Sequence, residues 1–265
     1  MSSADTPTPT PPPPRLLLIN PNTTSSMTEA LQPAISSLQL PVSVTLFTCP
    51  APGIPSINSP ADSARSADLC LPHLLHLLPH YDTFLIACYS HHPLVHLLKR
   101  ETTALTSAAT SGAGGTGARK YVTGIFEASV LACLSLLPEH ERFGIVSTGK
   151  VWETALTDAV QAFLHGGEAA TRYAGTETTG LNATELHDLP AEEVKQKMKE
   201  ATKRLLQRGN VGAICLGCAG MVGLDEAVRE ACVEELGDEK GKRVHIVDGV
   251  KAGVGQLVGN ARCAF

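Results

Sequence analysis

The chain has 265 residues, of which 43% are hydrophobic and 4% aromatic, and its formal net charge at pH 7 is −5. This length can bury the core of one large domain or two modest lobes, and the negative charge disfavours nucleic acid as a partner. No apolar run reaches the roughly 18 to 20 residues of a membrane span, and residues 1–14 lack the layout of a signal peptide. Several of the eight cysteines, including Cys88, Cys133 and Cys215, lie in apolar runs, which is typical of reduced thiols. We therefore expect a cytoplasmic protein without membrane contact.

The first part of the chain alternates apolar strands with helical patterns. Residues 1–14 are proline-rich and are predicted to be a disordered tail. Leu16 to Ile19 then form a buried strand that ends at the turn Asn20-Pro21-Asn22. The expected elements that follow are a helix through 27–31, a strand at 42–47, a helix at 61–78, a strand at 83–88 and a helix at 93–105.

Residues 107–120 form an insert rich in glycine, alanine and serine, which we expect to loop out of the fold. Gly112, Gly114 and Gly117 match the spacing of a dinucleotide fingerprint. No strand precedes them and no apolar helical pattern follows, so the context of such a site is missing. The sequence therefore predicts no cofactor here.

The second part of the chain repeats the alternation. The expected elements are strands at 121–125, 142–147, 211–216 and 244–247, and helices at 126–137, 151–164, 191–207 and 224–236, with a polar segment before residue 191. Such alternation predicts an α/β fold in which parallel sheets are flanked by helices. We assign residues 15–106 and 241–265 to a first lobe and residues 121–240 to a second.

Two cysteines follow apolar strands at corresponding places in the two halves. Cys88 ends the run TFLIAC, and Cys218 lies in the glycine-containing turn after VGAICLG. The carboxyl ends of parallel strands border the crevice where ligands bind. Backbone N–H groups at such turns favour the thiolate and are expected to lower the pKa of the thiols. If the lobes face each other, one thiol can take a proton from a carbon and the other can deliver one to its opposite face.

Several motifs resemble those of the hydantoin racemase branch of the aspartate/glutamate racemase superfamily, in particular its fungal members associated with allantoin and nitrogen catabolism. They occur in the expected order over about residues 15–258, and those at 20–23 and 217–221 are the most specific. The motifs are LINPNT at 18–23, ACYS at 87–90, GIFEAS at 124–129, FGIVST at 143–148, LGCAGM at 216–221 and VDGV at 247–250.

The resemblance implies two pseudo-symmetric lobes with the active site between them, and racemisation of a small cyclic ureide without a cofactor or metal. It also implies that Cys88 and Cys218 are the catalytic acid and base, and that the protein is a homo-oligomer. Substrate carbonyls and ring nitrogens would be held by Asn20 and by the turns Tyr89-Ser90, Ser147-Thr148 and Ala219-Gly220. After the first cysteine, the sequence Ser90 to Pro93 departs from the acidic residue and glycine of bacterial relatives, which puts the preferred substrate side chain in doubt.

Other interpretations of the same residues stay open. Cys215 and Cys218 have the spacing of a CxxC metal or redox site, but residues three apart in a strand point to opposite faces. Histidine pairs such as His73 with His76, or His92 with His96, have helical spacing for zinc ligands, without a cysteine or acid to complete the site. A protonated His91 or His92 could favour the Cys88 thiolate.

Three functional alternatives also remain. Both cysteines could be ordinary core residues, which is the usual place of a free cysteine. The thiols could act on a free amino acid, or in an isomerase or decarboxylase of a related carbon acid. The chain could also bind a ureide without turning it over, because fold does not imply function. Glu127, beside the expected crevice, is a candidate for substrate binding or helix capping.

Overall fold

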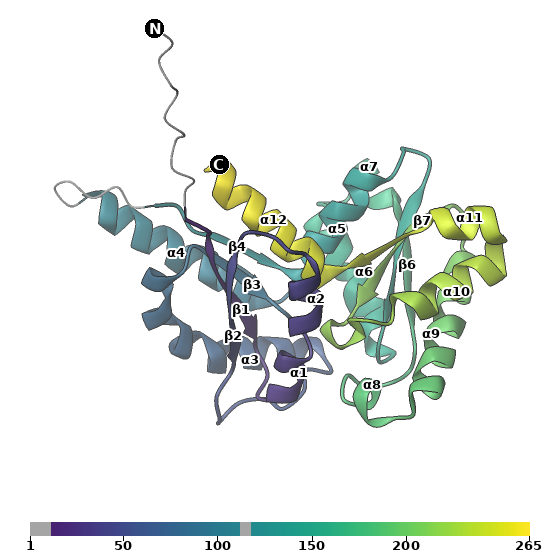
Figure 1. The fold of residues 1–265 in the computed structure, drawn as a ribbon, viewed down its shortest axis with the longest axis horizontal. Helices are drawn as coiled ribbons and strands as arrows, with labels where there is room; N and C mark the ends of the chain where they lie inside the picture. Colours follow the sequence, from purple (N-terminus) through teal and green to yellow (C-terminus); the bar gives the residue numbers. More distant parts are fainter. Residues whose placement is uncertain (1–11, 112–117) are drawn as a thin grey trace, which may run out of the picture.

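The computed structural model describes residues 12–111 and 118–265, so most of the predicted tail and the glycine motif at 112–117 lie outside the described residues. The described chain forms two lobes, each built on a four-stranded parallel sheet with helices on its faces (Figure 1). This is the α/β architecture of two lobes that the alternating pattern predicts.

The first sheet has the strand order β2-β1-β3-β4, and every pairing in it is parallel. Its strands are buried apolar runs at their centres, as expected for a sheet covered on both faces. The elements in chain order are β1 (Arg15–Asn20), α1 (Ser25–Glu29), α2 (Gln32–Ser37), β2 (Ser43–Thr48), α3 (Pro60–Leu74), the 3-10 helix η1 (Leu75–His80), β3 (Thr83–Ile86), α4 (Pro93–Ser111) and β4 (Tyr121–Gly124).

The second sheet has the order β6-β5-β7-β8, again parallel throughout, so the two sheets share one relative strand order. The two lobes are therefore pseudo-symmetric in topology. The elements are α5 (Ile125–Leu136), β5 (Arg142–Ser147), α6 (Val151–Phe163), α7 (Gly167–Thr171), β6 (Tyr173–Thr178), α8 (Glu185–Asp188), α9 (Ala191–Leu206), β7 (Val211–Gly217), the 3-10 helix η2 (Ala219–Met221), α10 (Asp225–Leu236), α11 (Asp238–Arg243), β8 (His245–Asp248) and α12 (Gly249–Cys263).

The boundary between the lobes differs from the expected one at both ends of the second lobe. Strand β4, which we assigned to the second lobe, pairs with β3 in the first sheet, with Gly124 opposite Ile86. Strand β8, which we assigned to the first lobe, pairs with β7. Only α12 returns to the first lobe, where it packs on α2, β3 and β4 (Figure 1). The apolar pattern of a segment can show that it is a strand, but it does not show which sheet the strand joins.

The buried side chains form three clusters, which correspond to layers. One lies between the first sheet and α3 and α4, and another lies between the second sheet and α9 and α10. The third is shared by the lobes: it joins Leu16 and Leu18 of β1 to Phe143 and Ile145 of β5 through residues of α5 and α12 such as Phe126. Alternation along the strands explains the division, because successive side chains point to opposite faces of a sheet. The lobes are thus held together by a continuous apolar core.

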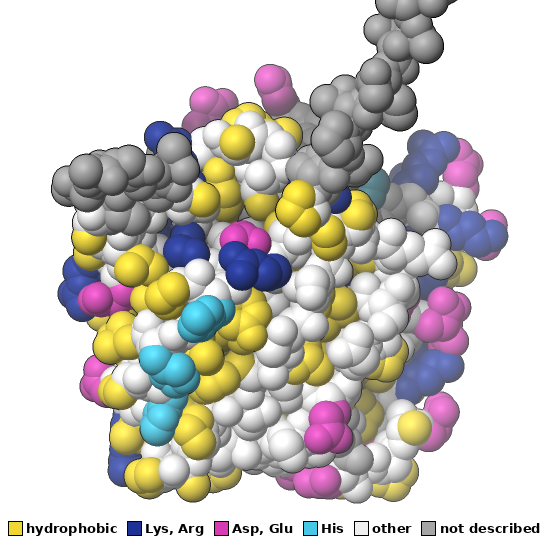
Figure 2. Space-filling view, turned by 60° about the vertical axis from the view of Figure 1, so that its left-hand side comes forward, with side chains coloured by type: hydrophobic (Ala, Val, Ile, Leu, Met, Phe, Trp, Pro, Cys, Tyr) yellow, Lys and Arg dark blue, Asp and Glu magenta, His cyan; other side chains and the backbone are white. Residues whose placement is uncertain are grey.

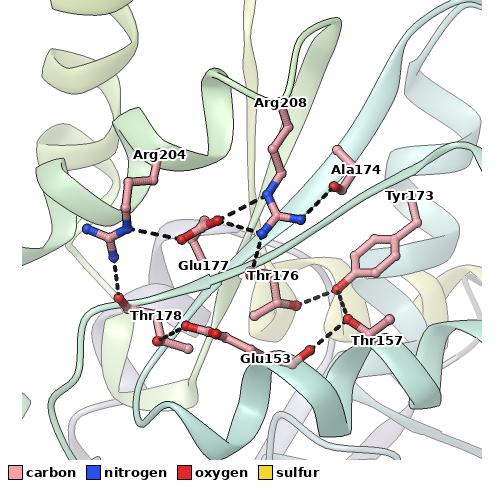
Figure 3. Close-up of polar contacts among 9 residues, drawn as sticks. All are labelled: Glu153, Thr157, Tyr173, Ala174, Thr176, Glu177, Thr178, Arg204 and Arg208. Carbon is pink, nitrogen blue, oxygen red and sulfur yellow. Dashed lines mark hydrogen bonds and ion pairs between the residues drawn. The ribbon is translucent and has the colours of Figure 1, made fainter.

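Strand β6 was not predicted, because its sequence YAGTET lacks apolar alternation. Two arginines bind its carbonyls and Glu177 (Figure 3): Arg204 lies in the last turn of α9, and Arg208 follows that helix. Arg208 contacts both Glu177, at 2.6 Å, and the carbonyl oxygen of Ala174, and Arg204 donates to the Thr178 carbonyl at 2.7 Å. Ionic and backbone contacts thus add to the packing of Tyr173 and Ala174 in stabilising this edge strand.

The insert and the first helices also differ from expectation. Helix α4 continues to Ser111, so the insert begins as helix, whereas the rest of its predicted loop up to 117 lies outside the described residues. The segment expected to form one helix through residues 27–31 is instead two short helices, α1 and α2, and Pro33 lies in the first turn of α2. Proline is tolerated there because the N–H it lacks would have no partner within the helix.

No helix in the described part of the chain is both long and apolar enough to cross a membrane. On the face shown in Figure 2, basic side chains are interspersed with acidic ones, and exposed histidines lie close together on the first lobe. Within residues 12–111 and 118–265, no group of three or more His, Cys, Asp or Glu side chains is placed to hold a metal ion.

Candidate active site

The ends of four strands carry most of the residues singled out from the sequence. Asn20 ends β1, Cys88 follows β3, Ser147 ends β5 and Cys218 follows β7. In both sheets the strand order reverses between the first and third strands of the lobe, which is the point where α/β folds bind ligands. The lobes therefore present their cysteines at equivalent switch points.

One pocket is lined by both cysteines. Of the predicted substrate-binding residues, five also line it, namely Asn20, Tyr89, Thr148, Ala219 and Gly220. The two others, Ser90 and Ser147, do not line this pocket. Ser147 donates a hydrogen bond to the carbonyl of Gly217 at 2.8 Å, so it braces the strand end that carries Cys218.

Other lining residues were missed in the sequence. Trp152 at the start of α6, Met27 of α1 and Ile57 of the proline-rich loop contribute apolar walls, and Asn22 contributes an amide. Trp152 is the one tryptophan of the sequence and follows the Ser147-Thr148 turn by one helical turn, which was an available signal. Ile57 lies in the loop from Cys49 to Pro60, which we expected to shape the pocket, although this residue was not singled out. For Met27 no local signal exists, because the approach of its helix to the pocket depends on the fold.

The Asn20 side chain organises the turn that follows β1. Its Nδ2 donates to Asn22 Oδ1 at 2.9 Å and to Thr28 Oγ1 at 2.9 Å, and its Oδ1 accepts from the Asn22 N–H at 3.1 Å. Asn22 Oδ1 in turn accepts from the Thr24 N–H. The Asn20 amide therefore holds the Asn-Pro-Asn turn in shape.

Ser90 supports Cys88 from behind. Its Oγ lies 3.5 Å from Cys88 Sγ and 3.3 Å from the Oγ of Ser63 on α3. The neighbouring His92 is buried, with Nε2 3.0 Å from Ser66 Oγ and Nδ1 accepting the Leu94 N–H. A chain of small hydroxyls therefore fixes the turn after the first cysteine.

The two histidines of this turn do not supply a positive charge to Cys88. Burial lowers the pKa of His92 to about 4, so its imidazole is neutral at neutral pH. The pKa of His91 is also lowered, by burial and by its neighbours His96 and Lys99. The hypothesis that a histidinium favours the Cys88 thiolate is therefore wrong for the resting protein.

Cys215 does not share a site with Cys218. Its Sγ lies 3.3 Å from that of Cys133 on α5, in a buried group next to the Tyr89 and Ser129 hydroxyls, which are 2.7 Å apart. Cys218 lies beyond the strand and its side chain is half-buried in the pocket. The CxxC spacing is therefore a coincidence of sequence rather than a ligand pair.

Burial dominates the pKa values of both pocket thiols, contrary to the expectation that the turns lower them. It raises the pKa of Cys88 to about 12, against the hydrogen bond from Ser90, and the charges of Cys218 and Glu127 raise it further. It raises the pKa of Cys218 to about 11, against the Gly220 N–H, which donates to Sγ at 3.4 Å. Each thiol has one such partner, and η2 is too short to act as a helix dipole. Burial in this pocket therefore favours the protonated form of both thiols.

Gly217 positions Cys218 because no side chain fits there. A Cβ at residue 217 would lie 2.7 Å from the carbonyl oxygen of Val146 and 2.7 Å from Ile145 Cγ2. We expect Gly217→Ala to lower the free energy of unfolding by about 1–3 kcal/mol, since the backbone of β5 must move. Urea denaturation would measure this, with Gly255→Ala as the control, because that helical position has no atom within 4 Å of a Cβ. Equal stabilities of the two variants would contradict the prediction.

The electrostatic character of the pocket is neutral. Among the described residues that line it there is no Lys, Arg, Asp or Glu; the polar groups are amides, hydroxyls, thiols and backbone N–H groups. Such a surface suits an uncharged ligand that has several hydrogen-bonding groups, because an unpaired ion would lose its hydration without compensation.

The chain matches the Asp/Glu/Hydantoin racemase family over residues 16–257. An uncharacterized protein of Schizosaccharomyces pombe is 34% identical over 94% of this chain and 92% of its own length. The hydantoin racemase of a Pseudomonas species is 27% identical over 91% of this chain and 83% of its own. Among solved structures, the allantoin racemase from Klebsiella pneumoniae superposes with a TM-score of 0.70 at 25% identity, covering 95% of this chain and 89% of that one. With this match over nearly its whole length, the chain belongs to the Asp/Glu/Hydantoin racemase family.

Proposed function

We propose that this protein is a cofactor-independent racemase of a cyclic ureide, either allantoin or a 5-substituted hydantoin, in which Cys88 and Cys218 exchange protons with the ring carbon. The observation that carries the proposal is the pocket that both thiols line, each at the same switch point of its lobe. Relatives named as allantoin and hydantoin racemases support the choice of ureide.

The neutral pocket supports a ureide over a free amino acid. A zwitterionic amino acid would bring a carboxylate and an ammonium group, and the lining residues offer no side chain of opposite charge for either. A ureide ring carries carbonyls and N–H groups without a net charge. The amide of Asn22, the Thr148 hydroxyl and the backbone N–H groups near Ala219 and Gly220 are suited to such a ring.

The reaction follows from one thiolate and one thiol on opposite sides of the ring carbon. The thiolate takes the proton from the carbon, and the electron pair moves into the adjacent carbonyl to form an enolate. Backbone N–H groups at the strand ends stabilise that oxygen as charge develops on it. The opposite thiol then gives its proton to the other face, so the configuration is inverted and the two cysteines exchange protonation states. No electrons are transferred and no external reagent is consumed.

The test is to incubate purified protein with one enantiomer of allantoin, and separately of a hydantoin, in deuterated buffer near neutral pH. We expect optical rotation to fall and deuterium to enter the ring carbon at matching rates, well above the rate without protein. Racemisation of glutamate or aspartate but of no ureide would favour the amino-acid alternative. A ureide that raises the melting temperature without rotation loss or exchange would favour the binding-protein alternative.

A further inference from the structure

Glu127 is a buried carboxyl group that the two-cysteine reaction does not use. It lies in the first turn of α5, immediately after β4, and is 4% exposed. Neither of its carboxyl oxygens has a hydrogen-bond partner among the residues that the structure describes. An unpartnered buried carboxyl is costly and tends to occur at functional sites.

Gly124 allows this carboxyl to fold back against the end of β4. A Cβ at residue 124 would lie 2.3 Å from Glu127 Oε2 and 3.1 Å from Val95 Cγ2 of α4. Gly124 is paired with Ile86, two residues before Cys88. The carboxyl group therefore lies at the carboxyl end of β4, next to the end of β3 that precedes Cys88.

The charge of Glu127 acts on the two cysteines unequally. It raises the pKa of Cys88, together with burial and the charge of Cys218, whereas burial and the Gly220 N–H account for the pKa of Cys218. Burial also raises the pKa of Glu127 itself, to about 7. The backbone N–H groups of Glu127 and Gly124, which lie near the carboxyl without meeting the geometry of a hydrogen bond, and the charge of Lys99 oppose this shift. Apart from Cys133 of α5 itself, the titratable groups on β4, β7, β8 and α12, the elements packed around α5, are Tyr121, Cys215, His245, Asp248, Lys251, Arg262 and Cys263.

We infer that Glu127 is a positioning residue whose charge adds to the tendency of Cys88, rather than Cys218, to keep its proton. When the carboxyl is ionised, Cys88 is held more firmly as the thiol and Cys218 becomes the readier thiolate. When it is protonated, this contribution is lost. The inference rests on the proposed function, because it assigns the order of proton transfer within the same cysteine pair: Cys218 takes the first proton and Cys88 gives the second.

The inference can be tested without any substrate. The rates at which iodoacetamide alkylates Cys88 and Cys218 would be measured by peptide mass spectrometry from about pH 5.5 to about pH 8.5, since only the thiolate reacts. In the wild-type protein, the ratio of the Cys88 rate to the Cys218 rate should fall as Glu127 ionises near neutral pH, on the order of fivefold for a nearby unit charge. In Glu127→Gln the ratio should stay at the acidic value of the wild type throughout. Glu127→Asp, which keeps the charge, should retain the fall.

Glu139→Gln is the matched control, because it removes one exposed carboxyl beyond the opposite end of α5 and should leave the wild-type profile unchanged. A ratio in the wild-type protein that does not change with pH would overturn the inference, and this result needs no variant to fold. A fall that persists in Glu127→Gln would also overturn it. If the ratio behaves as expected but no ureide is racemised, the proposed function fails while the charge effect stands, so the two failures are distinguishable.

Discussion

Cys218→Ser is expected to lower the rate of ureide racemisation by about 10³-fold, within the range that a positioned acid or base contributes. A serine hydroxyl is far less acidic than a thiol, so it neither gives nor takes a proton readily at neutral pH. Cys88→Ser should have an effect of similar size, because each enantiomer requires one group on each side of the ring. The measurement is the loss of optical rotation of each enantiomer.

Deuterium exchange separates the roles of the two thiols further. In each single variant the remaining thiolate can still take a proton from one face and return deuterium to it. We therefore expect Cys88→Ser and Cys218→Ser to exchange opposite enantiomers without inverting them. Cys263→Ser is the control, since that cysteine is exposed at the end of α12 and should leave racemisation intact. Exchange of the same enantiomer by both variants would refute the placement of the thiols on opposite faces.

Phe126→Ala is expected to lower the free energy of unfolding by about 3–5 kcal/mol, the usual cost of removing a fully buried aromatic ring. Phe126 is 0% exposed and belongs to the cluster shared by both lobes. Its ring packs edge-on against Tyr89, with centroids 5.8 Å apart, and against Phe163, with centroids 6.0 Å apart. The cavity left by alanine would therefore loosen both the junction of the lobes and the turn that carries Cys88.

Urea denaturation would measure this loss, with Leu136→Ala as the control on the same helix. Leu136 is 48% exposed, so its truncation should change stability by no more than about 0.5 kcal/mol. A loss below about 1 kcal/mol for Phe126→Ala would mean that the shared cluster does not hold the lobes together, since core truncations of this size normally cost more.

The strands and the two cysteines could be located from local sequence. The apolar runs of β1, β3, β5 and β7 are each long enough to identify a buried strand, and their order in the chain predicts parallel pairing. Cys88 and Cys218 stand directly after two of these runs, so their shared position at strand ends was also readable. The lining residues Asn20, Thr148, Ala219 and Gly220 were predicted from the family resemblance of the motifs in which they lie.

Other features depend on partners that are distant in sequence. Strand β6 was missed because its sequence lacks apolar alternation, and Arg204 and Arg208, which bind its Glu177, come some thirty positions later. The lobe to which β4 or β8 belongs is a matter of pairing, which the apolar pattern of one segment does not encode. Met27 reaches the pocket from a helix of the first lobe whose position against the second lobe's turn is set only in the folded chain.

The pKa values of the two thiols also depend on parts of the chain that are distant in sequence. From the sequence, a turn after a strand predicts a lowered thiol pKa, because backbone N–H groups are local. In the folded protein the surrounding lobes desolvate both thiols, and that effect is larger than the single hydrogen bond each receives. The sequence by itself therefore determined the fold class and the position of Cys88 and Cys218 after two corresponding strands. Only the tertiary structure decided the lobe boundaries, the neutral pocket and the charge states, because burial and strand pairing depend on segments brought together from far along the chain.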